Sequence, residues 1–311
     1  MRRRLRTANL TPDERIPIAD VEKYYLPMTD GNAHIMGLQS VGLQTDDDGF
    51  ARDQAATLTL DDVARMMMDY SGNAETDYLI TRLGPEKIAS VIQKTGLEHH
   101  TPIGLTLGFA LATFNHEEPS FSTRQLQSVI AEISTGDTSH FDRLTGLYVN
   151  DPQWRAAQIE FMKSINEQSV GGVDMWTYQT VASQLLPKGT VREYAKMMAQ
   201  IASQKFISPE VSELMQQKLE NVPSDWPLRV LFYDRFGAKD GVTAGVLTLA
   251  SYAVPKRGPL SQQARVVVLI TTQLPVEDWT EQLNYQGHYV LAIDLAQATG
   301  TFAQLFGAGN E

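Results

Sequence analysis

The stretch LTLDDVARMMMDYSGNAETDYLITRLG, residues 58–84, decides which fold the sequence can adopt. Its first half has the pattern of an amphipathic helix, in which Thr59 can cap the N-terminus while Asp61 and Asp62 lie favourably in the first turn. Apolar residues recur at helical spacing and form a stripe that must be buried against another element. This stripe consists of Leu60, Val63, Ala64, Met67 and Met68.

A short polar break, Ser71-Gly72-Asn73, interrupts the helical pattern, which resumes in AETDYLITRL and ends at Gly84. Pro85 then opens a third short helix. The break can be an ordinary turn between helices, because glycine and asparagine favour turns. It can also be a site at which a hydroxyl and an amide are held outside the end of a helix.

The rest of the chain changes from helical patterns to strand patterns. Residues 97–185 mix helical pieces with Gly-, Thr- and Ser-rich connections, and TVREYAKMMAQIASQKF and SPEVSELMQQKLE predict two further helices. From about residue 227, LRVLFYDRFGA, GVTAGVLTLASYAV and QARVVVLITTQLP predict strands, because they are rich in branched and aromatic residues. GHYVLAIDLAQATGTFAQLF predicts a final helix that lies on the sheet.

This order of elements predicts an α+β fold, a helical block followed by an antiparallel sheet with a C-terminal helix. We expect three parts. They are an N-terminal segment at residues 1–57, a mainly helical part at 58–226, and the sheet with its helix at 227–311.

Composition excludes several classes of function. Hydrophobic residues make up 42% and charged residues 20% of the 311 residues, as in a globular protein, and no apolar run is long enough for a membrane span. The net charge of -11 predicts no nucleic-acid partner, because the one basic cluster is MRRRLR at the start. There is no cysteine, and His99-His100 lacks the i, i+4 spacing of a helical metal site, so we predict neither a metal nor a cofactor.

The succession of motifs resembles the class A β-lactamase and penicillin-binding-protein superfamily of serine hydrolases. Its Ser-x-Asn element matches Ser71-Gly72-Asn73 at a helix end, and its Lys-x-Gly element matches Lys239-Asp240-Gly241 in FGAKDGVTAGVLTLASYAVP. ERIPIADVEKYYLP and PKGTVREYAKMMAQI are also similar to family segments. The resemblance covers about residues 14–96 and 186–306, and residues 97–185 resemble an enlarged insertion.

The resemblance implies a β-lactamase/transpeptidase-like fold and a site for acyl transfer. Ser71 would relay a proton to the leaving nitrogen, and Lys239 would favour that transfer and attract the substrate carboxylate. Asn73 would bond the amide side chain of the substrate and help to fix the general-base lysine. Asp240 and Gly241 complete the substrate-binding set, because the missing Cβ of Gly241 lets the strand backbone approach the substrate.

The chain departs from the family pattern at the nucleophile. The family's first motif is Ser-x-x-Lys, and no serine in this sequence has a lysine three positions later. The 13 residues that precede Glu14 contain no serine, so the motif would lie upstream of Met1. Either the written start is too late, or the gene has lost its front and the product is inert. We prefer truncation, because both remaining motifs still support the chemistry.

Two smaller departures concern carboxylates. Gly72 replaces the aspartate of Ser-Asp-Asn, a residue that normally braces the turn. The Glu-x-x-Leu-Asn loop that supplies the deacylating base of β-lactamases is also missing, since NDPQWRAA and EQLNY lack the spacing. Without that base, water attacks an acyl-enzyme slowly, which favours a penicillin-binding or esterase-like relative.

The leading hypothesis is therefore a serine hydrolase acting on a β-lactam or peptidoglycan-type amide, inactive as written. The alternative is a non-catalytic binding or scaffold protein of the cell envelope, with residues 97–185 as its contact surface and Tyr148, Trp154 and Trp176 as anchors or, alternatively, as core residues. The MRRRLRTANLTPDE start is not a signal peptide, and the resemblance implies an extracytoplasmic location if one lies upstream.

Overall fold

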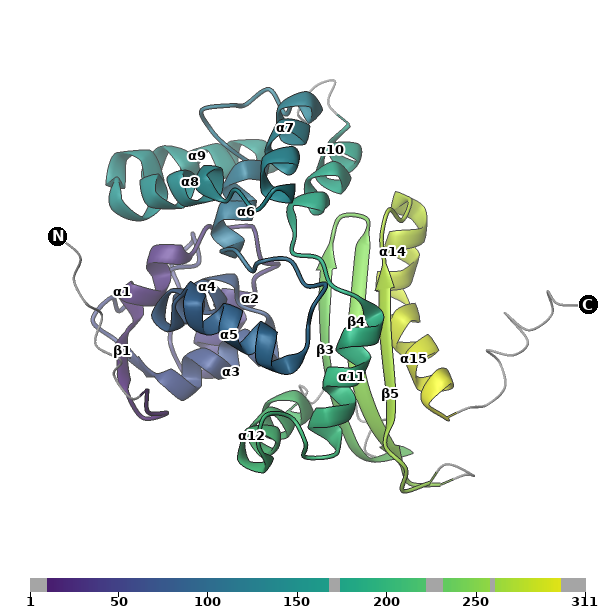
Figure 1. Cartoon of the computed structure of the whole chain (residues 1–311). Coiled ribbons are helices and arrows are strands. Elements are labelled where there is room, and N and C mark those ends of the chain that lie inside the picture. The colour runs from purple at the N-terminus through teal and green to yellow at the C-terminus, as the bar shows by residue number, and fades with distance from the viewer. Residues whose placement is uncertain (1–9, 168–173, 222–231, 258–260, 298–311) are drawn as a thin grey trace, which may run out of the picture. The chain divides into compact units, whose positions relative to one another are not determined.

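The computed structural model describes residues 10–167, 174–221, 232–257 and 261–297 (Figure 1). The chain forms two compact units, Met1–Arg82 and Leu83–Glu311. The predicted α+β class is confirmed, with helices and a small sheet in the first unit, and helices with a three-stranded antiparallel sheet in the second. The predicted division at 226–227 lies outside the described residues, and the three-part division remains a prediction.

The first unit packs short helices around the stretch that opens the sequence argument. Its strands β1 and β2 pair antiparallel, with Ile16 opposite Leu58. In chain order the elements are β1 (Arg15–Pro17), α1 (Ile18–Val21), the 3-10 helix η1 (Glu22–Tyr24), α2 (Ala33–Ser40), β2 (Thr57–Thr59), α3 (Leu60–Tyr70) and α4 (Asn73–Leu83).

The start of α3 is fixed as the sequence predicts. The hydroxyl of Thr59 accepts a hydrogen bond from the backbone N–H of Asp62 at 3.0 Å. The carboxylate of Asp62 accepts one from the backbone N–H of Thr59, also at 3.0 Å. This reciprocal capping box satisfies two backbone donors that the first helical turn would otherwise leave unpaired.

The buried face of α3 differs from the predicted stripe in its last turn. Leu60, Val63 and Met66 are buried, whereas Met67 and Met68 are half-buried. Met66 lies against Gly37 of α2, where an added Cβ would come within 2.8 Å of its terminal methyl. The choice of Met66 therefore depends on contact with α2, which the periodicity of α3 alone does not reveal.

The second unit consists of a helical region followed by the sheet. Its helices before the sheet are α5 (Pro85–Thr95), α6 (Thr106–Thr113), α7 (Thr123–Ser134), α8 (Ser139–Asn150), α9 (Pro152–Glu167), α10 (Met175–Ala182), the 3-10 helix η2 (Ser183–Leu185), α11 (Val191–Ala202) and α12 (Pro209–Glu220). After the sheet come α14 (Val276–Asn284) and α15 (Gly287–Gln297). Ser208 caps α12, because its hydroxyl accepts from the backbone N–H of Val211 at 3.2 Å.

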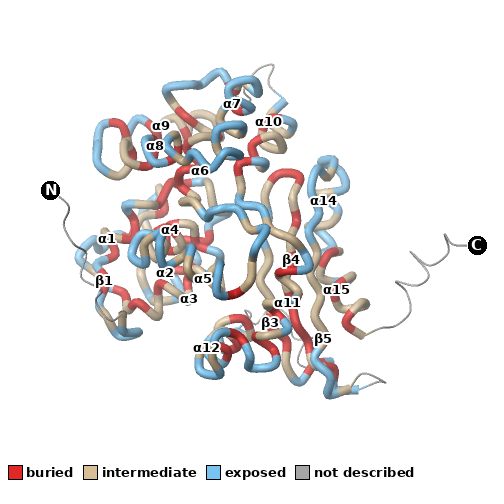
Figure 2. Tube along the Cα trace, viewed as in Figure 1, coloured by how far each residue is buried: buried red, intermediate tan, exposed pale blue. Residues whose placement is uncertain are grey.

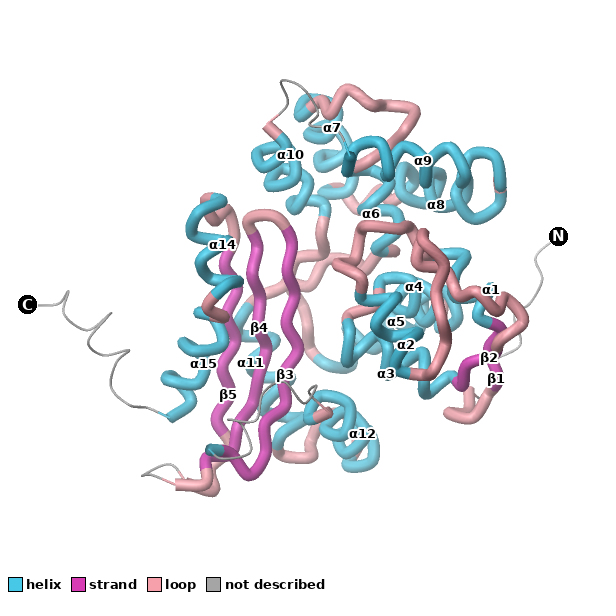
Figure 3. Tube along the Cα trace, turned by 180° about the vertical axis from the view of Figure 1, so that it is seen from behind, coloured by secondary structure: helices cyan, strands magenta, loops and turns pink. Residues whose placement is uncertain are grey.

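The sheet has the order β3-β4-β5, with β3 (Tyr233–Thr243), β4 (Val246–Pro255) and β5 (Arg265–Thr271) all antiparallel. Figures 1 and 3 show α11 on one face and α15 on the other. Buried residues alternate along much of β4, as the red stretches of Figure 2 show. Among the described residues, β5 has β4 as its single strand neighbour.

No helix in the described part of the chain is both long and apolar enough to span a membrane.

Replacing Thr59 by alanine removes the cap of α3, and we expect the first unit to lose about 1 kcal/mol of stability. Amide hydrogen exchange of α3 measures this loss directly, whereas all four tryptophans lie beyond residue 82 and report on the second unit. The matched control is Thr81→Ala, the same change at an exposed position of α4. Equal protection factors in the two variants would contradict the capping argument.

Candidate active site

The break between α3 and α4 holds Ser71 in a backbone conformation that non-glycine residues adopt rarely. Ser71 has φ 66° and ψ 36°, in the left-handed region, and its side chain is exposed. Its backbone N–H donates to the carbonyl of Met66, which closes the last turn of α3. The predicted polar break is confirmed, and it carries the hydroxyl outside the helix end.

Gly72 and Asn73 are fixed by contacts within the first unit. The side-chain amide of Asn73 donates to the carbonyl of Thr29 at 3.3 Å, which ties the turn to the loop before α2. Gly72 is buried, and a Cβ added there would lie 2.0 Å from Oε2 of Glu75. Its φ is outside the left-handed region, so the glycine is required for space.

Buried charged side chains lie beneath this turn. Glu22, His34 and Glu75 are each at most 2% exposed. Nδ1 of His34 is 2.6 Å from Oε1 of Glu75, and Nε2 of His34 is 3.4 Å from Oε1 of Glu22. Burial alone lowers the pKa of His34, but hydrogen bonds to the two carboxylates and their charges outweigh it and raise the pKa to about 9. His34 is therefore an imidazolium at neutral pH.

Other polar groups support this buried cluster. Glu22 also accepts from the backbone N–H of Ala51 at 2.6 Å and from the side-chain amide of Gln54 at 2.7 Å. Asp30 accepts from the backbone N–H of His34 at 3.0 Å, and burial raises the pKa of its carboxyl. Sequence reasoning missed the cluster. The available signal is NAETD, which places acidic residues on an otherwise half-apolar helix, and Glu75 and Asp77 there are fully buried.

The second predicted segment lies on β3 of the second unit, which within the described residues is an edge strand. Lys239, Asp240 and Gly241 are opposite Ala250, Leu249 and Thr248 of β4. The ammonium of Lys239 is 3.5 Å from the carboxylate of Asp240 and donates to the Asp240 carbonyl at 3.2 Å. A Cβ at Gly241 would come within 2.8 Å of the Thr248 hydroxyl, so a side chain there would crowd the neighbouring strand.

Strand alternation sends Lys239 and Asp240 to opposite faces of the sheet. Burial, followed by the charge of Asp240, raises the pKa of Tyr289 on α15, so Asp240 belongs to the α15 face. Lys239 shares the other face with Gly237. An ideal Cβ at Gly237 would lie 2.5 Å from the ring of Tyr252, so the glycine leaves room for that ring. The carboxylate of Asp240 interacts with Tyr289. The predicted contact of Asp240 with a substrate remains a prediction.

Tyr252 belongs to a polar cluster on the Lys239 face. Its hydroxyl donates to Oε1 of Glu220 at 2.6 Å, and Nε of Arg235 donates to the same oxygen at 3.0 Å. The guanidinium of Arg235 also lies 5.6 Å from the centre of the Tyr252 ring. These contacts join α12 to β3 and β4, and they give the strand that carries Lys239 a fixed support.

The predicted site residues thus form two groups. Ser71 and Asn73 lie at one turn of the first unit, and Lys239 to Gly241 lie on one strand of the second. The catalytic and binding roles of both groups remain predictions. Their convergence on a common site remains a prediction.

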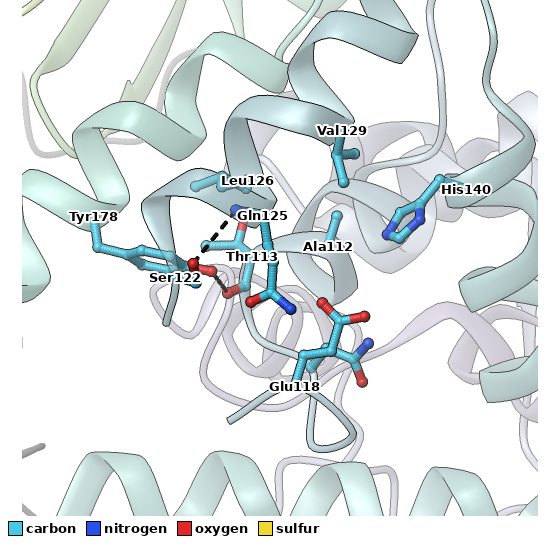
Figure 4. Close-up of a pocket in the computed structure, with 10 residues that line it drawn as sticks. Ala112, Thr113, Glu118, Ser122, Gln125, Leu126, Val129, His140 and Tyr178 are labelled. Carbon is cyan, nitrogen blue, oxygen red and sulfur yellow. Dashed lines mark hydrogen bonds between the residues drawn. The ribbon is translucent and has the colours of Figure 1, made fainter. Parts of the chain in front are cut away.

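A small polar pocket lies elsewhere, in the helical region of the second unit (Figure 4). The hydroxyl of Tyr178 donates to the carbonyl of Thr113 at 2.7 Å, and the hydroxyl of Ser122 accepts from the backbone N–H of Gln125 at 3.4 Å. The first bond joins α10 to α6, and the second caps α7. Among the described residues, no group of three or more His, Asp or Glu side chains could hold a metal ion.

Comparisons with known proteins agree with the motifs. The model of the "Beta-lactamase enzyme family" matches residues 3–244, a range that includes both Ser71-Gly72-Asn73 and Lys239-Asp240-Gly241. No curated protein sequence matches the chain significantly.

Several solved structures are similar to the chain at low identity. The β-lactamase from Sphaerobacter thermophilus is 15% identical with a TM-score of 0.45, covering 95% of this chain and 86% of that one. PBP-A is 12% identical with a TM-score of 0.39, covering 89% and 83%. The chromosome-encoded β-lactamase of Vibrio parahaemolyticus is 10% identical with a TM-score of 0.41, covering 93% and 86%. Family membership rests on the sequence match.

The raised pKa of His34 predicts how stability depends on pH. The stabilisation by the imidazolium is complete below the ordinary pKa of 6.5 and is lost as the pH rises through about 9. We therefore expect the free energy of unfolding of the first unit to fall by up to about 3 kcal/mol across this interval. Urea unfolding followed by far-ultraviolet circular dichroism measures it.

The matched control for this pH dependence is Glu75→Gln, which keeps the shape of the side chain and removes one charge beside His34. The slope should become shallower in that variant, because the pKa of His34 is then closer to its ordinary value. A native stability that stays constant or rises between these two pH values would show that His34 is not held as an imidazolium.

Proposed function

Because the chain belongs to the β-lactamase enzyme family, we propose that it carries the proton-relay and carboxylate-binding parts of an acyl-transfer site for a β-lactam or peptidoglycan-type amide. The observation that carries the proposal is the family match itself, since the matched range contains both motifs in the family's order. The turn at Ser71 and the edge strand at Lys239 support it, because each presents its polar group at an accessible end or edge.

Each residue has a role that its chemistry allows. The hydroxyl of Ser71 would pass a proton to the leaving nitrogen, and its exposure outside the helix end suits that transfer. The ammonium of Lys239, whose side chain is 31% exposed, would attract the substrate carboxylate. Asn73 would present its side-chain amide to the substrate from a position that its bond to Thr29 fixes.

The nucleophile is the part that this sequence does not supply. Acyl transfer by the family needs a serine and a base in a Ser-x-x-Lys motif, and the 311 residues contain none. The residues present can bind and orient an amide and can move its proton, but they cannot form the acyl-enzyme. The proposal is therefore limited to binding and proton transfer by these residues.

We expect no hydrolysis of nitrocefin by the 311-residue chain above that of its Ser71→Ala variant, because a relay without a nucleophile forms no acyl intermediate. The assay is the colour change on ring opening, with intact-mass measurement after exposure to benzylpenicillin as a second readout. Turnover or a covalent adduct above the control would show that another residue acts as nucleophile.

The same assay separates the two explanations of the missing motif. If the coding sequence continues in frame upstream of Met1 to a Ser-x-x-Lys, the longer product should hydrolyse nitrocefin, and Ser71→Ala should slow it by about 10²–10⁴-fold. An in-frame stop favours a non-catalytic envelope protein or an inert relic. Two of the three surface anchors suggested for that alternative are wrong, because Tyr148 and Trp154 are buried core residues, as the other reading of them expected.

The proposal also requires that Ser71 and Lys239 face a common site. The natural chain has no cysteine, so a Ser71→Cys/Lys239→Cys double variant carries two thiols and no others. A short bis-maleimide should join them, since groups that act on one substrate lie within its reach. Each single variant is the control for non-specific labelling. Reaction of both thiols with separate reagent molecules, without a cross-link, would refute the shared site.

A further inference from the structure

The space beside Gly72 is filled by the carboxylate of Glu75, in the first turn of α4. An ideal Cβ at Gly72 would lie 2.0 Å from Oε2 and 2.8 Å from the carboxyl carbon of Glu75. These distances are far shorter than a van der Waals contact, so any residue with a side chain at position 72 would have to displace Glu75. The glycine and the glutamate are thus coupled by steric exclusion.

Glu75 cannot move away easily, because it is anchored and enclosed. Its side chain is 0% exposed, and Oε1 is held 2.6 Å from Nδ1 of His34. Its other oxygen, Oε2, is buried and has no hydrogen-bond partner within the described residues. A buried carboxylate oxygen without a partner is costly, so the position of Oε2 against the turn needs an explanation.

We propose that Glu75 replaces, from one helical turn further along, the carboxylate that the Ser-Asp-Asn turn of the family carries at position 72. Glu75 is then a positioning residue for Ser71 and Asn73, and Gly72 is the partner substitution that makes room for it. The role assigned to Ser71 and Asn73 rests on the proposed function, whereas the exchange between positions 72 and 75 does not.

The geometry supports positioning in three steps. His34 on α2 holds Oε1 of Glu75, and Glu22 on η1 holds the other ring nitrogen of His34. The remaining oxygen of Glu75 then occupies the space that a Cβ at Gly72 would take. This chain of contacts connects η1 and α2 to the turn between α3 and α4, so the turn cannot shift without disturbing a buried ion pair.

A double-mutant cycle tests the exchange. In the natural background, Gly72→Asp should lower the melting temperature of the first unit by about 5 °C or more, because two carboxylates then compete for one buried space. In a Glu75→Ala background the same substitution should raise the melting temperature, because the carboxylate introduced at position 72 fills the vacated space. That reversal of sign distinguishes an exchange from two independent losses, and equal shifts in both backgrounds would overturn it.

The matched control is Gly146→Asp on α8 of the second unit, where an added Cβ meets nothing within 4 Å. Its effect should be the same whether residue 75 is glutamate or alanine. Far-ultraviolet circular dichroism and amide exchange of α3 and α4 follow the first unit. If Gly72→Asp prevents folding, Gly72→Ala serves in the same cycle, since it carries the steric conflict without the charge.

The melting temperatures report on stability alone. A second measurement is needed to show that Glu75 also fixes the position of the turn. The side-chain amide of Asn73 donates to the carbonyl of Thr29, so the nuclear magnetic resonance signals of its two amide protons would report on the turn. We expect these signals to shift in Glu75→Ala and to return towards their natural positions in the Gly72→Asp/Glu75→Ala variant. An unchanged signal in Glu75→Ala would overturn the positioning role.

These readouts do not involve β-lactam turnover or binding. A sign reversal in a protein that shows no cross-link between positions 71 and 239 would refute the proposed function and leave the exchange standing. Additive shifts in a protein that does show the cross-link would refute the exchange alone.

Discussion

The first unit depends on one buried ion pair, between the imidazolium of His34 and the carboxylate of Glu75. Removing one partner of such a pair costs about 3–5 kcal/mol, because it leaves a buried charge uncompensated, whereas replacing the whole pair by apolar residues is often neutral. The pair therefore contributes less to stability than to the choice of one arrangement. It fixes α4 against α2, and with Glu22 it fixes η1 as well.

In the second unit, another cluster of charged and polar side chains supports the strand that carries Lys239. Glu220 accepts from both Arg235 and Tyr252, and this cluster lies on the face of the sheet that carries Lys239. Burial and the neighbouring carboxylate raise the pKa of Tyr252, so its hydroxyl stays protonated and keeps donating to Glu220. In both units, a cluster of polar side chains that joins several elements accompanies a residue with the chemistry of the family.

Sequence reasoning succeeds here where the determinants are local. The cap at Thr59 and the break at Ser71 both depend on residues within a few positions of one another. The predicted strand GVTAGVLTLASYAV is wrong at its start, because Gly241–Thr243 end β3 and β4 begins at Val246. Sequence reasoning fails where a distant element decides. Met66 is buried because Gly37 faces it, and Glu75 is buried because His34 pairs with it. Gly72 combines the two cases. Comparison with the family motif shows that the aspartate is missing, and only the packing shows that the carboxylate of Glu75 fills the space beside Gly72.

The turn itself separates structural from functional requirements. Packing accounts for Gly72, which makes room for Glu75, and a bond to Thr29 accounts for the position of Asn73. Ser71 is different, because a left-handed conformation costs a residue with a Cβ about 1–2 kcal/mol and glycine would adopt it at less cost. The chain therefore keeps a hydroxyl where the backbone favours glycine. Under the proposed function, the proton relay at this accessible helix end is the reason for a hydroxyl at this position.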